Sequence, residues 1–560
     1  MNSIFRGVFV HRYRDVVPDI RAACMEELGV WMRGFPASFL SDGHLKYLGW
    51  NLHDKEPLVR LRCVRSLRAL YALPDTAAQM ELFTGRFKDR LLAMVLDKDP
   101  KVGVEVVGLL TEMLGTLPEA LPPSERHRVY PALFGSHRAL AAAAGLFLLR
   151  SLLQPRHDAD NQAFLLALLD FFISSQLHAH SAYLVDSLWD CAGERLRDWD
   201  GICAILLSDA LTDQQEKVLL ELLAATATRV TQGQPPPGRR NPRKPQPRTQ
   251  PEERTRLSHC MAPVLPRLLA KFSVDAQKVL ALLELLGCME LRVFCAARME
   301  RALSQSLAQL QELLHKHTGP EVLRAAARAL GAFCDPELPL SGRGDLVRSQ
   351  LVDGLSRKWE RDFRELLGPQ SASLDEEELF NMAATLRRLA AIFASHNLTP
   401  WRLLPRLLLL LQRSADTGEV PPQVVVPAIT CAQLHLLWQL SQLRAGAATE
   451  EELQSLRGTM SSFCALCQSA LSDGDGAVRE EAFVALSDLL LVLGRAVTRG
   501  DAALLSPLRI VPDAALRAQL AAFLLDHVFT HSAGVCPQRV PNVSPGCPQR
   551  VPKASPTYPQ

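Results

Sequence analysis

Residues 42–71 read DGHLKYLGWNLHDKEPLVRLRCVRSLRALY, and this stretch decides the fold class. Apolar side chains recur at i, i+3, i+4 and i+7 on both sides of the polar turn HDKEP at 53–57. That spacing predicts two amphipathic helices joined by a tight turn. The same pattern fills most of the chain and is broken by short turns about every fifteen to twenty residues, so we expect helices throughout.

A loose signature recurs at these turns. Asp54-Lys-Glu-Pro57-Leu-Val59-Arg60 returns as Asp97-Lys-Asp-Pro100-Lys-Val102, as Thr318-Gly-Pro320-Glu-Val322-Leu-Arg324 and as Asp473-Gly-Asp-Gly-Ala-Val478-Arg479. The acidic or hydroxyl residue suits a helix cap, proline suits the first helical turn, and we expect the valine to point inward. Helix pairs with such a junction are typical of HEAT repeats. We therefore predict an all-α, HEAT-like α-solenoid; the alternative is an irregular all-α domain without repeats.

Composition agrees with helices and with an intracellular protein. The chain of 560 residues is longer than a single hydrophobic core supports, so it must divide into domains or form a repeat array. Of its residues 48% are hydrophobic and only 6% are aromatic, a composition that favours helices. A net charge of +2, from 62 basic and 60 acidic residues, predicts no strong overall field, so nucleic-acid binding would need a local basic patch. The thirteen cysteines are scattered, which predicts reduced, buried thiols. Those we expect to be buried include Cys63, Cys203, Cys288, Cys295 and Cys334.

Membrane and secretion signals are missing from the pattern. The opening MNSIFRGVFVHRYRD lacks the apolar core of a signal peptide. FLLALLDFFI at 164–173 and LLPRLLLLLQ at 403–412 are shorter than the ~18 apolar residues of a membrane span. We expect both to be buried helix faces of a soluble protein.

Two segments leave the helical pattern. Residues 232–256 contain seven prolines and seven Arg or Lys, which predicts a disordered basic loop. Residues 532–560 contain CPQRVP twice, which predicts a disordered low-complexity tail. A shorter polar loop is expected at 155–161.

No catalytic, metal or cofactor motif is present. Cys464-x-x-Cys467 lies in an amphipathic stretch without a second pair, so two helix-face thiols are expected rather than a zinc site. His178 and His180, two positions apart on an expected helix, would face different ways. The chain contains no GxGxxG, GxxxxGK[ST], HExxH or GxSxG. We therefore predict that the protein is not an enzyme and that it has no catalytic residue, metal or cofactor.

The opening stretch also resembles a known family. The order FxGVFVHRYRD, LKYLGW, HDK and VRLRC is similar to the stromalin-conservative domain of stromal-antigen (Scc3-type) cohesin subunits. ELFTGRFKDR at 81–90, SAYLVDSLWDCAGERL at 181–196, LLAKFSVDAQKV at 268–279 and LDHVFTH at 525–531 resemble further blocks of that family. Three segments are most similar to its meiosis-specific third paralogue: SAYLVDSLWDCAGERL, FNMAATLRRLAA at 380–391 and FCALCQSALSD at 463–473. With this resemblance we divide the chain into a stromalin-conservative-like domain (1–85), HEAT-like repeats (86–231), the basic loop (232–256), further HEAT-like repeats (257–531) and the tail (532–560).

The resemblance implies a non-catalytic scaffold of sister-chromatid cohesion in the nucleus, associated with chromosomes. Such a subunit docks on the kleisin and through it on the SMC heterodimer, contacts chromatin, and recruits regulators; no membrane or small-molecule substrate is implied. In mitotic relatives a surface built from the conserved domain together with bound kleisin receives short aromatic motifs of shugoshin and of a zinc-finger insulator factor. The matching positions are Tyr13, Leu45, Lys46, Trp50, Arg86 and Phe87, with Asp42 at the rim.

Periodicity bears on two of the aromatic side chains. Leu45, Leu48 and Leu52 form a stripe that leaves out Lys46 and Trp50. Exposure of Trp50 is therefore compatible with the pattern, a core position is the alternative, and the resemblance favours exposure. Tyr47 is expected in the core.

The sequence gives weaker signals for kleisin and DNA contacts than for the aromatic-motif surface. Asp513 matches a position that the family uses against kleisin, and an ordinary helix N-cap explains it equally well. Scattered Arg and Lys give salt-sensitive, sequence-independent DNA affinity. The candidates are Arg6, Arg12, Arg14, Arg60, Arg62, Arg65, Arg239, Arg240, Arg243 and Lys244.

The chain departs from the family at both ends. The family's counterpart of MNSIF is internal, whereas here this segment opens the chain with Met1, and the resemblance stops after LDHVFTH. This implies a chain truncated at both ends. The alternatives to a cohesin subunit are a generic HEAT-repeat adaptor for other clients and a truncated product with impaired cohesin assembly.

Overall fold

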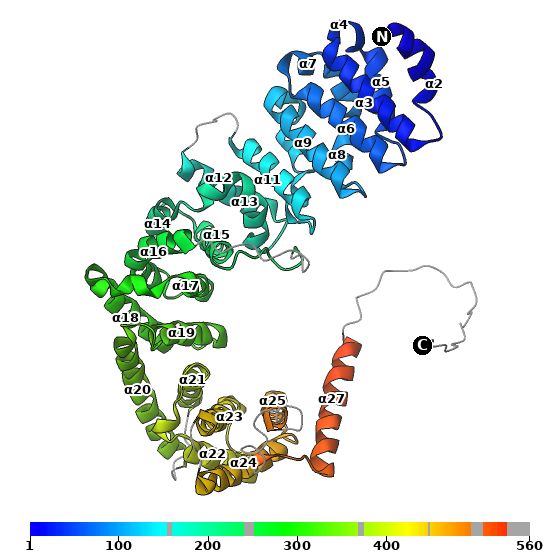
Figure 1. The fold of residues 1–560 in the computed structure, drawn as a ribbon. Helices are drawn as coiled ribbons and strands as arrows, with labels where there is room; N and C mark the ends of the chain where they lie inside the picture. The colour runs from blue at the N-terminus through cyan, green and yellow to red at the C-terminus, as the bar shows by residue number, and fades with distance from the viewer. Residues whose placement is uncertain (154–159, 240–250, 368–374, 446–448, 494–507, 535–560) are drawn as a thin grey trace, which may run out of the picture. The chain divides into compact units, whose positions relative to one another are not determined.

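The computed structural model describes residues 1–153, 160–239, 251–367, 375–445, 449–493 and 508–534. Every regular element in these ranges is helical, which confirms the predicted all-α fold (Figure 1). Contacts divide the chain into two compact units, Met1–Arg357 with Ala394–His396, and Lys358–Phe393 with the residues from Asn397 onward.

The first unit is a row of helix pairs in two layers. One layer stacks α3, α6, α9, α11, α13, α15, α17 and α19 in that order, and the other includes α12, α14, α16 and α18. Figure 1 shows α15, α17 and α19 side by side within this row. The helices up to residue 116 are α1 (Asn2–Ile4), the π-helical turn η1 (Phe5–Phe9), α2 (Val10–Arg12), α3 (Pro18–Gly34), α4 (Pro36–Phe39), α5 (Asp42–Asn51), α6 (Pro57–Tyr71), α7 (Pro74–Ala78), α8 (Glu81–Ala93), η2 (Met94–Leu96) and α9 (Pro100–Thr116). The later ones are η3 (Pro118–Ala120), α10 (Pro123–Arg126), η4 (Tyr130–Phe134), α11 (Arg138–Leu153), α12 (Asn161–Ser175), α13 (Ser181–Leu196), α14 (Trp199–Leu207), α15 (Asp213–Gln232), α16 (Pro251–Lys271), α17 (Ala276–Cys288), η5 (Leu291–Cys295), η6 (Ala297–Met299), α18 (Glu300–Lys316), α19 (Pro320–Phe333) and the first part of α20 (Ser341–Leu367).

The repeated turn works as the sequence predicts, with one addition. The valines of the signature, Val59, Val102, Val322 and Val478, are all buried. Asp99 caps α9 by accepting a hydrogen bond from the Lys101 amide at 2.8 Å. The addition is the arginine: Arg60 donates to the carbonyls of Asp54 and Lys55 at 2.8 and 3.0 Å, closing its own turn.

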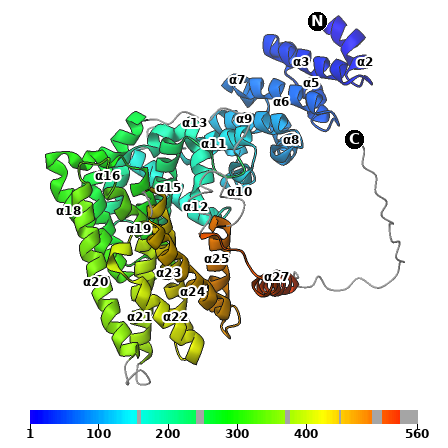
Figure 2. The same cartoon turned by 60° about the horizontal axis from the view of Figure 1, so that its bottom comes forward.

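The second unit repeats the two-layer arrangement. Helices α21, α23 and α25 stack in one row, and α22 packs on α24 in the other. Figure 2 shows α22 to α25 side by side. The elements are the last part of α20, α21 (Glu376–Phe393), η8 (Thr399–Trp401), α22 (Leu404–Thr417), α23 (Pro422–Ala445), α24 (Glu450–Ala470), α25 (Gly476–Leu493) and α27 (Ala514–Gly534).

One helix meets the length and composition of a membrane span, contrary to the sequence-based expectation. It is Pro422–Leu443 within α23, and 61% of its apolar window is buried against the rest of the protein, as in a core helix. Leu407 and Leu410 of α22 are buried too, as predicted for the run at 403–412.

Several smaller expectations need correction. Cys295 is exposed because it ends the short η5, whereas Cys63, Cys203, Cys288 and Cys334 are buried as predicted. His178 and His180 precede α13 rather than lying on a helix. Two parts of the predicted basic loop 232–256 differ from the prediction, because residues 251–256 lie in α16, which begins at Pro251, and Arg239 is buried. Arg240, Arg243, Lys244 and most of the predicted loop at 155–161 and tail at 532–560 lie outside the described residues.

Candidate partner-binding surface

Helix α5 has two faces with different tasks. Leu45, Leu48 and Leu52 at its end are at most 1% exposed and form the inner face. Asp42, Lys46 and Trp50 follow one another at i, i+4 and i+8, so they share a different face of the helix. Trp50 is 42% exposed, which confirms the exposure expected for it.

The Trp50 ring is held by its neighbours. Tyr47, half-buried rather than fully in the core as expected, meets it edge to face with ring centroids 5.6 Å apart. Tyr13 also meets Tyr47 edge to face, with ring centroids 4.8 Å apart. The Lys46 ammonium lies 5.5 Å from the Trp50 ring centroid and 5.3 Å from that of Tyr47, within the range of a cation–π attraction.

Helix α8 brings Arg86 and Phe87 beside α5. The Phe87 ring packs against Gly49, where an added Cβ would stand only 2.3 Å from a ring carbon. Arg90 donates two hydrogen bonds to the Leu52 carbonyl, at 3.2 and 2.9 Å, and so fixes α8 to the end of α5. The Arg86 guanidinium lies 5.7 Å from the Phe87 ring centroid and is exposed to solvent.

The seven predicted positions therefore divide into two groups. Asp42, Lys46, Trp50 and Arg86 are at least partly accessible and are called the Trp50 surface below. Tyr13 and Phe87 are each 8% exposed and support that surface from beneath. Leu45 is 1% exposed, so it faces the core and is not a contact residue.

Two supporting residues were missed from the sequence. Tyr47 links Tyr13 to Trp50, and its spacing of three from Trp50 is a signal that could have revealed it. Gly49 permits the approach of Phe87, and a glycine inside a helix, where it is destabilising, is itself a hint of close packing.

The predicted DNA contacts are mostly engaged within the protein. Arg62 pairs with Glu26 at 2.6 Å, Arg65 with Glu105 at 3.0 Å, and Arg12 with Asp15 at 2.9 Å. Arg6 and Arg14 are exposed and have no ion pair within the described residues.

Two of these arginines are buried and cannot reach a phosphate. Arg60 pairs with Asp97 at 2.6 Å. The Arg239 side chain pairs with Asp186 at 2.9 Å and also donates to the carbonyls of Gly135, Tyr183 and Leu133. Their charges are matched inside the fold, so we withdraw both as DNA-binding candidates.

Comparison with known proteins identifies the family. The sequence profile of the stromalin conservative domain matches residues 14–88, and that of the cohesin subunit SCC3/SA HEAT-repeats domain matches residues 183–438. The chain belongs to the SCC3/SA family of cohesin subunits. The first match contains the Trp50 surface, and the fold that α13 to α23 adopt is the HEAT-repeat part of an SCC3/SA protein.

Individual relatives agree with the family. The chain is 47% identical over 548 residues to cohesin subunit SA-3 of Homo sapiens, an alignment that covers 94% of this chain and 45% of the relative. It is 43% identical over 194 residues to the human putative STAG3-like protein 1, covering 35% of this chain and 83% of that protein. This chain thus spans about half the length of the SA-3 relative.

A solved structure supports the predicted solenoid. Cohesin subunit Scc3 from Z. rouxii superposes on 97% of this chain and on 67% of its own chain, with a TM-score of 0.67 and 16% sequence identity. At that identity the likeness concerns the fold alone, and it confirms a HEAT-like solenoid of the SCC3/SA kind.

The position that the SCC3/SA resemblance assigns to kleisin lies at the start of α27. Asp513 is exposed, and its Oδ1 accepts a hydrogen bond from the Leu516 amide at 2.7 Å. It is therefore an N-cap, which leaves its second oxygen for a partner.

Proposed function

We propose that this chain is a non-catalytic cohesin scaffold that docks on the kleisin, and through it on the SMC heterodimer, at chromosomes in the nucleus. It recruits regulators that carry aromatic motifs, shugoshin-type proteins among them, and acts in sister-chromatid cohesion, with a meiotic role in keeping with its similarity to SA-3. The observation that carries the proposal is the Trp50 surface, in which a large aromatic ring is kept partly exposed beside the Lys46 ammonium.

The chemistry of the Trp50 surface suits a short aromatic and acidic motif. A ligand ring stacked on Trp50 would bury apolar area that is now in water, and aromatic and arginine side chains are common binding hot spots. Lys46 and Arg86 would pair with carboxylates beside the ligand ring. Tyr47, itself packed on Tyr13, already restrains the Trp50 ring in the free protein. Binding should therefore cost little further side-chain entropy at Trp50.

Kleisin docking is tested by fluorescence anisotropy of a labelled central segment of the kleisin at physiological salt. We expect saturable micromolar or tighter binding, weakened at least tenfold by Asp513→Lys. Asp513→Asn is the matched control for folding, since asparagine also caps helices. A well-folded sample that does not bind would assign kleisin docking to longer relatives rather than to this chain.

Regulator recruitment is tested with a labelled peptide that carries two phenylalanines next to acidic residues. Trp50→Ala should weaken binding by about 2–4 kcal/mol, the range of a hot-spot residue. Phe380→Ala is the control, because Phe380 is 43% exposed and lies far from α5 in sequence. Equal effects of the two substitutions would favour a generic HEAT adaptor in which the Trp50 surface has no special role.

A further inference from the structure

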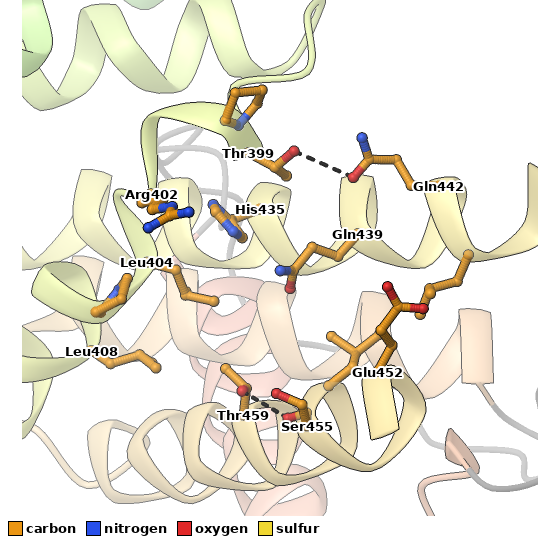
Figure 3. Close-up of a pocket in the computed structure, with 14 residues that line it drawn as sticks. Thr399, Arg402, Leu404, Leu408, His435, Gln439, Gln442, Glu452, Ser455 and Thr459 are labelled. Atoms are coloured by element: carbon orange, nitrogen blue, oxygen red, sulfur yellow. Dashed lines mark hydrogen bonds between the residues drawn. The ribbon is translucent and has the colours of Figure 1, made fainter. Parts of the chain in front are cut away.

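A second recess lies entirely within the second unit, away from the Trp50 surface in sequence. Three helices line an open recess of about 840 Å³, together with residues of η8 (Figure 3). Leu404 and Leu408 come from α22, Gln439 and Gln442 from α23, and Leu456 and Thr459 from α24. We call this the α22–α24 groove.

Polar side chains that line the groove have hydrogen-bonding capacity left for a ligand. His435 is only 3% exposed, lines the groove, and its Nδ1 has no hydrogen-bond partner. Buried polar atoms usually have a hydrogen-bond partner, so this nitrogen is available to a group that enters the groove. Gln439 and Gln442 present carboxamides one helical turn apart, and a carboxamide can donate and accept as a peptide group does. The Gln442 oxygen already accepts a hydrogen bond from the Thr399 hydroxyl at 3.3 Å, which leaves its NH2 group to donate to a ligand.

The groove has charges of opposite sign on its two sides. Figure 3 shows Arg402 beside α22 and Glu452 on α24, with Gln439 between them. Arg402 is exposed and has no ion pair within the described residues. Glu452 accepts a hydrogen bond from the Thr449 amide at 3.0 Å, and the hydrogen bonds with Thr449 lower its pKa, so it is charged at neutral pH.

The backbone of Arg402 is strained. Its φ is +49°, in the left-handed region, where non-glycine residues other than Asn and Asp are uncommon. Such strain clusters at binding sites, because the surrounding fold must hold it in place. Here the left-handed turn ends η8 at the edge of the groove and sets Arg402 among its lining residues.

We propose that the α22–α24 groove binds an extended segment of a partner protein, with an acidic residue at Arg402, aliphatic residues between, and a basic residue at Glu452. An extended segment leaves backbone amides free for Gln439 and Gln442, whereas a bound helix satisfies its own amides internally. The opposite charges at the two sides set the direction in which the segment lies.

The test uses two substitutions that each remove one charge and keep the local structure. Arg402→Asn places a residue that tolerates the left-handed region, so its stability to urea should equal or exceed that of the wild type. Glu452→Gln keeps the capping box, in which glutamine replaces glutamate. Arg457→Gln on α24 is the control, since Arg457 is exposed but does not line the groove.

The probe is a phage-displayed library of random peptides about twelve residues long, which extend to roughly 40 Å, selected on the full chain. We expect enriched peptides with an acidic and a basic residue separated by aliphatic ones. A synthetic enriched peptide should bind at least tenfold more weakly to Arg402→Asn and to Glu452→Gln, and equally to Arg457→Gln. Replacing its acidic residue by the amide should weaken binding to the wild type and change nothing further in Arg402→Asn.

Three results would overturn the proposal: no enrichment, enriched peptides without opposite charges, or binding that both groove substitutions leave unchanged. Kleisin binding and its Asp513 dependence are read separately, so failure here leaves the proposed function standing.

Discussion

Arg60 on α6 donates two hydrogen bonds to the carboxylate of Asp97 in the next repeat, at 2.9 and 2.6 Å. Arg21 does the same to Asp54 one repeat earlier, at 2.7 and 2.8 Å. Arg60 also donates to the carbonyls of its own turn, and Arg21 donates to those of Asp15 and Val16, so each arginine joins two successive turns. Burial opposes ionisation of Asp97, yet the hydrogen bonds from Arg60 and the Asp99 amide still leave its pKa lowered.

Breaking this link should destabilise the first unit. We expect Arg60→Ala to lower the free energy of unfolding by about 3–5 kcal/mol, because it leaves the Asp97 carboxylate buried without its partner. Arg62→Ala, two residues away in a more exposed pair with Glu26, should change it by less than about 1 kcal/mol. Urea denaturation followed by circular dichroism compares the two, and equal losses would contradict a structural role for Arg60.

The turn signature alone predicts the repeat, because proline, valine and the capping acid act within a few residues of one another. It does not predict the role of Arg60. In sequence Arg60, Arg62 and Arg65 look alike, and only packing of α6 on α9 places Asp97 beside the first of them. Local periodicity predicts which face of a helix a residue occupies, but it does not predict which charged residue of the next repeat will pair with it.

The same limit applies to the two sites. The register of Leu45, Leu48 and Leu52 separates Trp50 from the core of α5, so its exposure follows from the pattern. The α22–α24 groove has no sequence signature, because its charges come from η8 and α24, which only the fold brings to the same recess. The burial of Arg239 could not be predicted either, because its proline-rich and basic neighbours are typical of a solvated loop.

Gly49→Ala should disturb the Trp50 surface from beneath. The added methyl group would overlap the Phe87 ring, which must shift or tilt away from α5. We expect a loss of about 1–3 kcal/mol in unfolding free energy and weaker binding of the aromatic peptide.

Gly85→Ala is the matched control for this change. Gly85 lies on α8 with nothing within 4 Å of an added Cβ, so alanine should stabilise the helix by up to about 1 kcal/mol. If both substitutions act alike in thermal melts, the close approach of Phe87 to Gly49 is not the constraint we describe.

Arg239→Ala should loosen the segment that leads into the basic stretch. Asp186 would lose its 2.9 Å partner while buried, keeping only the longer contacts to Arg229 at 3.3 Å and Arg138 at 3.7 Å. We expect a loss of about 3 kcal/mol or more and faster amide hydrogen exchange in α13. Arg239→Lys should rescue little, because an ammonium cannot replace the several directed hydrogen bonds of the guanidinium. Full rescue by lysine would show that charge alone matters there.

The stability of the chain should fall between pH 6.5 and pH 4 because of two buried histidines. Burial lowers the pKa of His435 to about 4, and burial together with the Arg348 charge lowers that of His396 to about 4. In the unfolded chain both imidazoles take up protons below about pH 6.5, whereas in the fold they stay neutral. Their contribution is therefore complete above pH 6.5 and lost as the pH falls to 4, by up to about 3 kcal/mol each.

His435→Phe tests this dependence directly. Phenylalanine keeps an aromatic ring against Phe393, whose ring centroid lies 5.7 Å from that of His435, and cannot be protonated. The variant should lose less thermal stability than the wild type between pH 6.5 and 4.5. His53→Phe, at an exposed position, should follow the wild-type curve. The link between Arg60 and Asp97 responds at lower pH than the imidazoles, because the hydrogen bonds from Arg60 and the Asp99 amide lower the pKa of the Asp97 carboxyl below its ordinary value. A wild-type stability that is flat down to pH 4.5 would mean that both imidazoles reach water in the folded state.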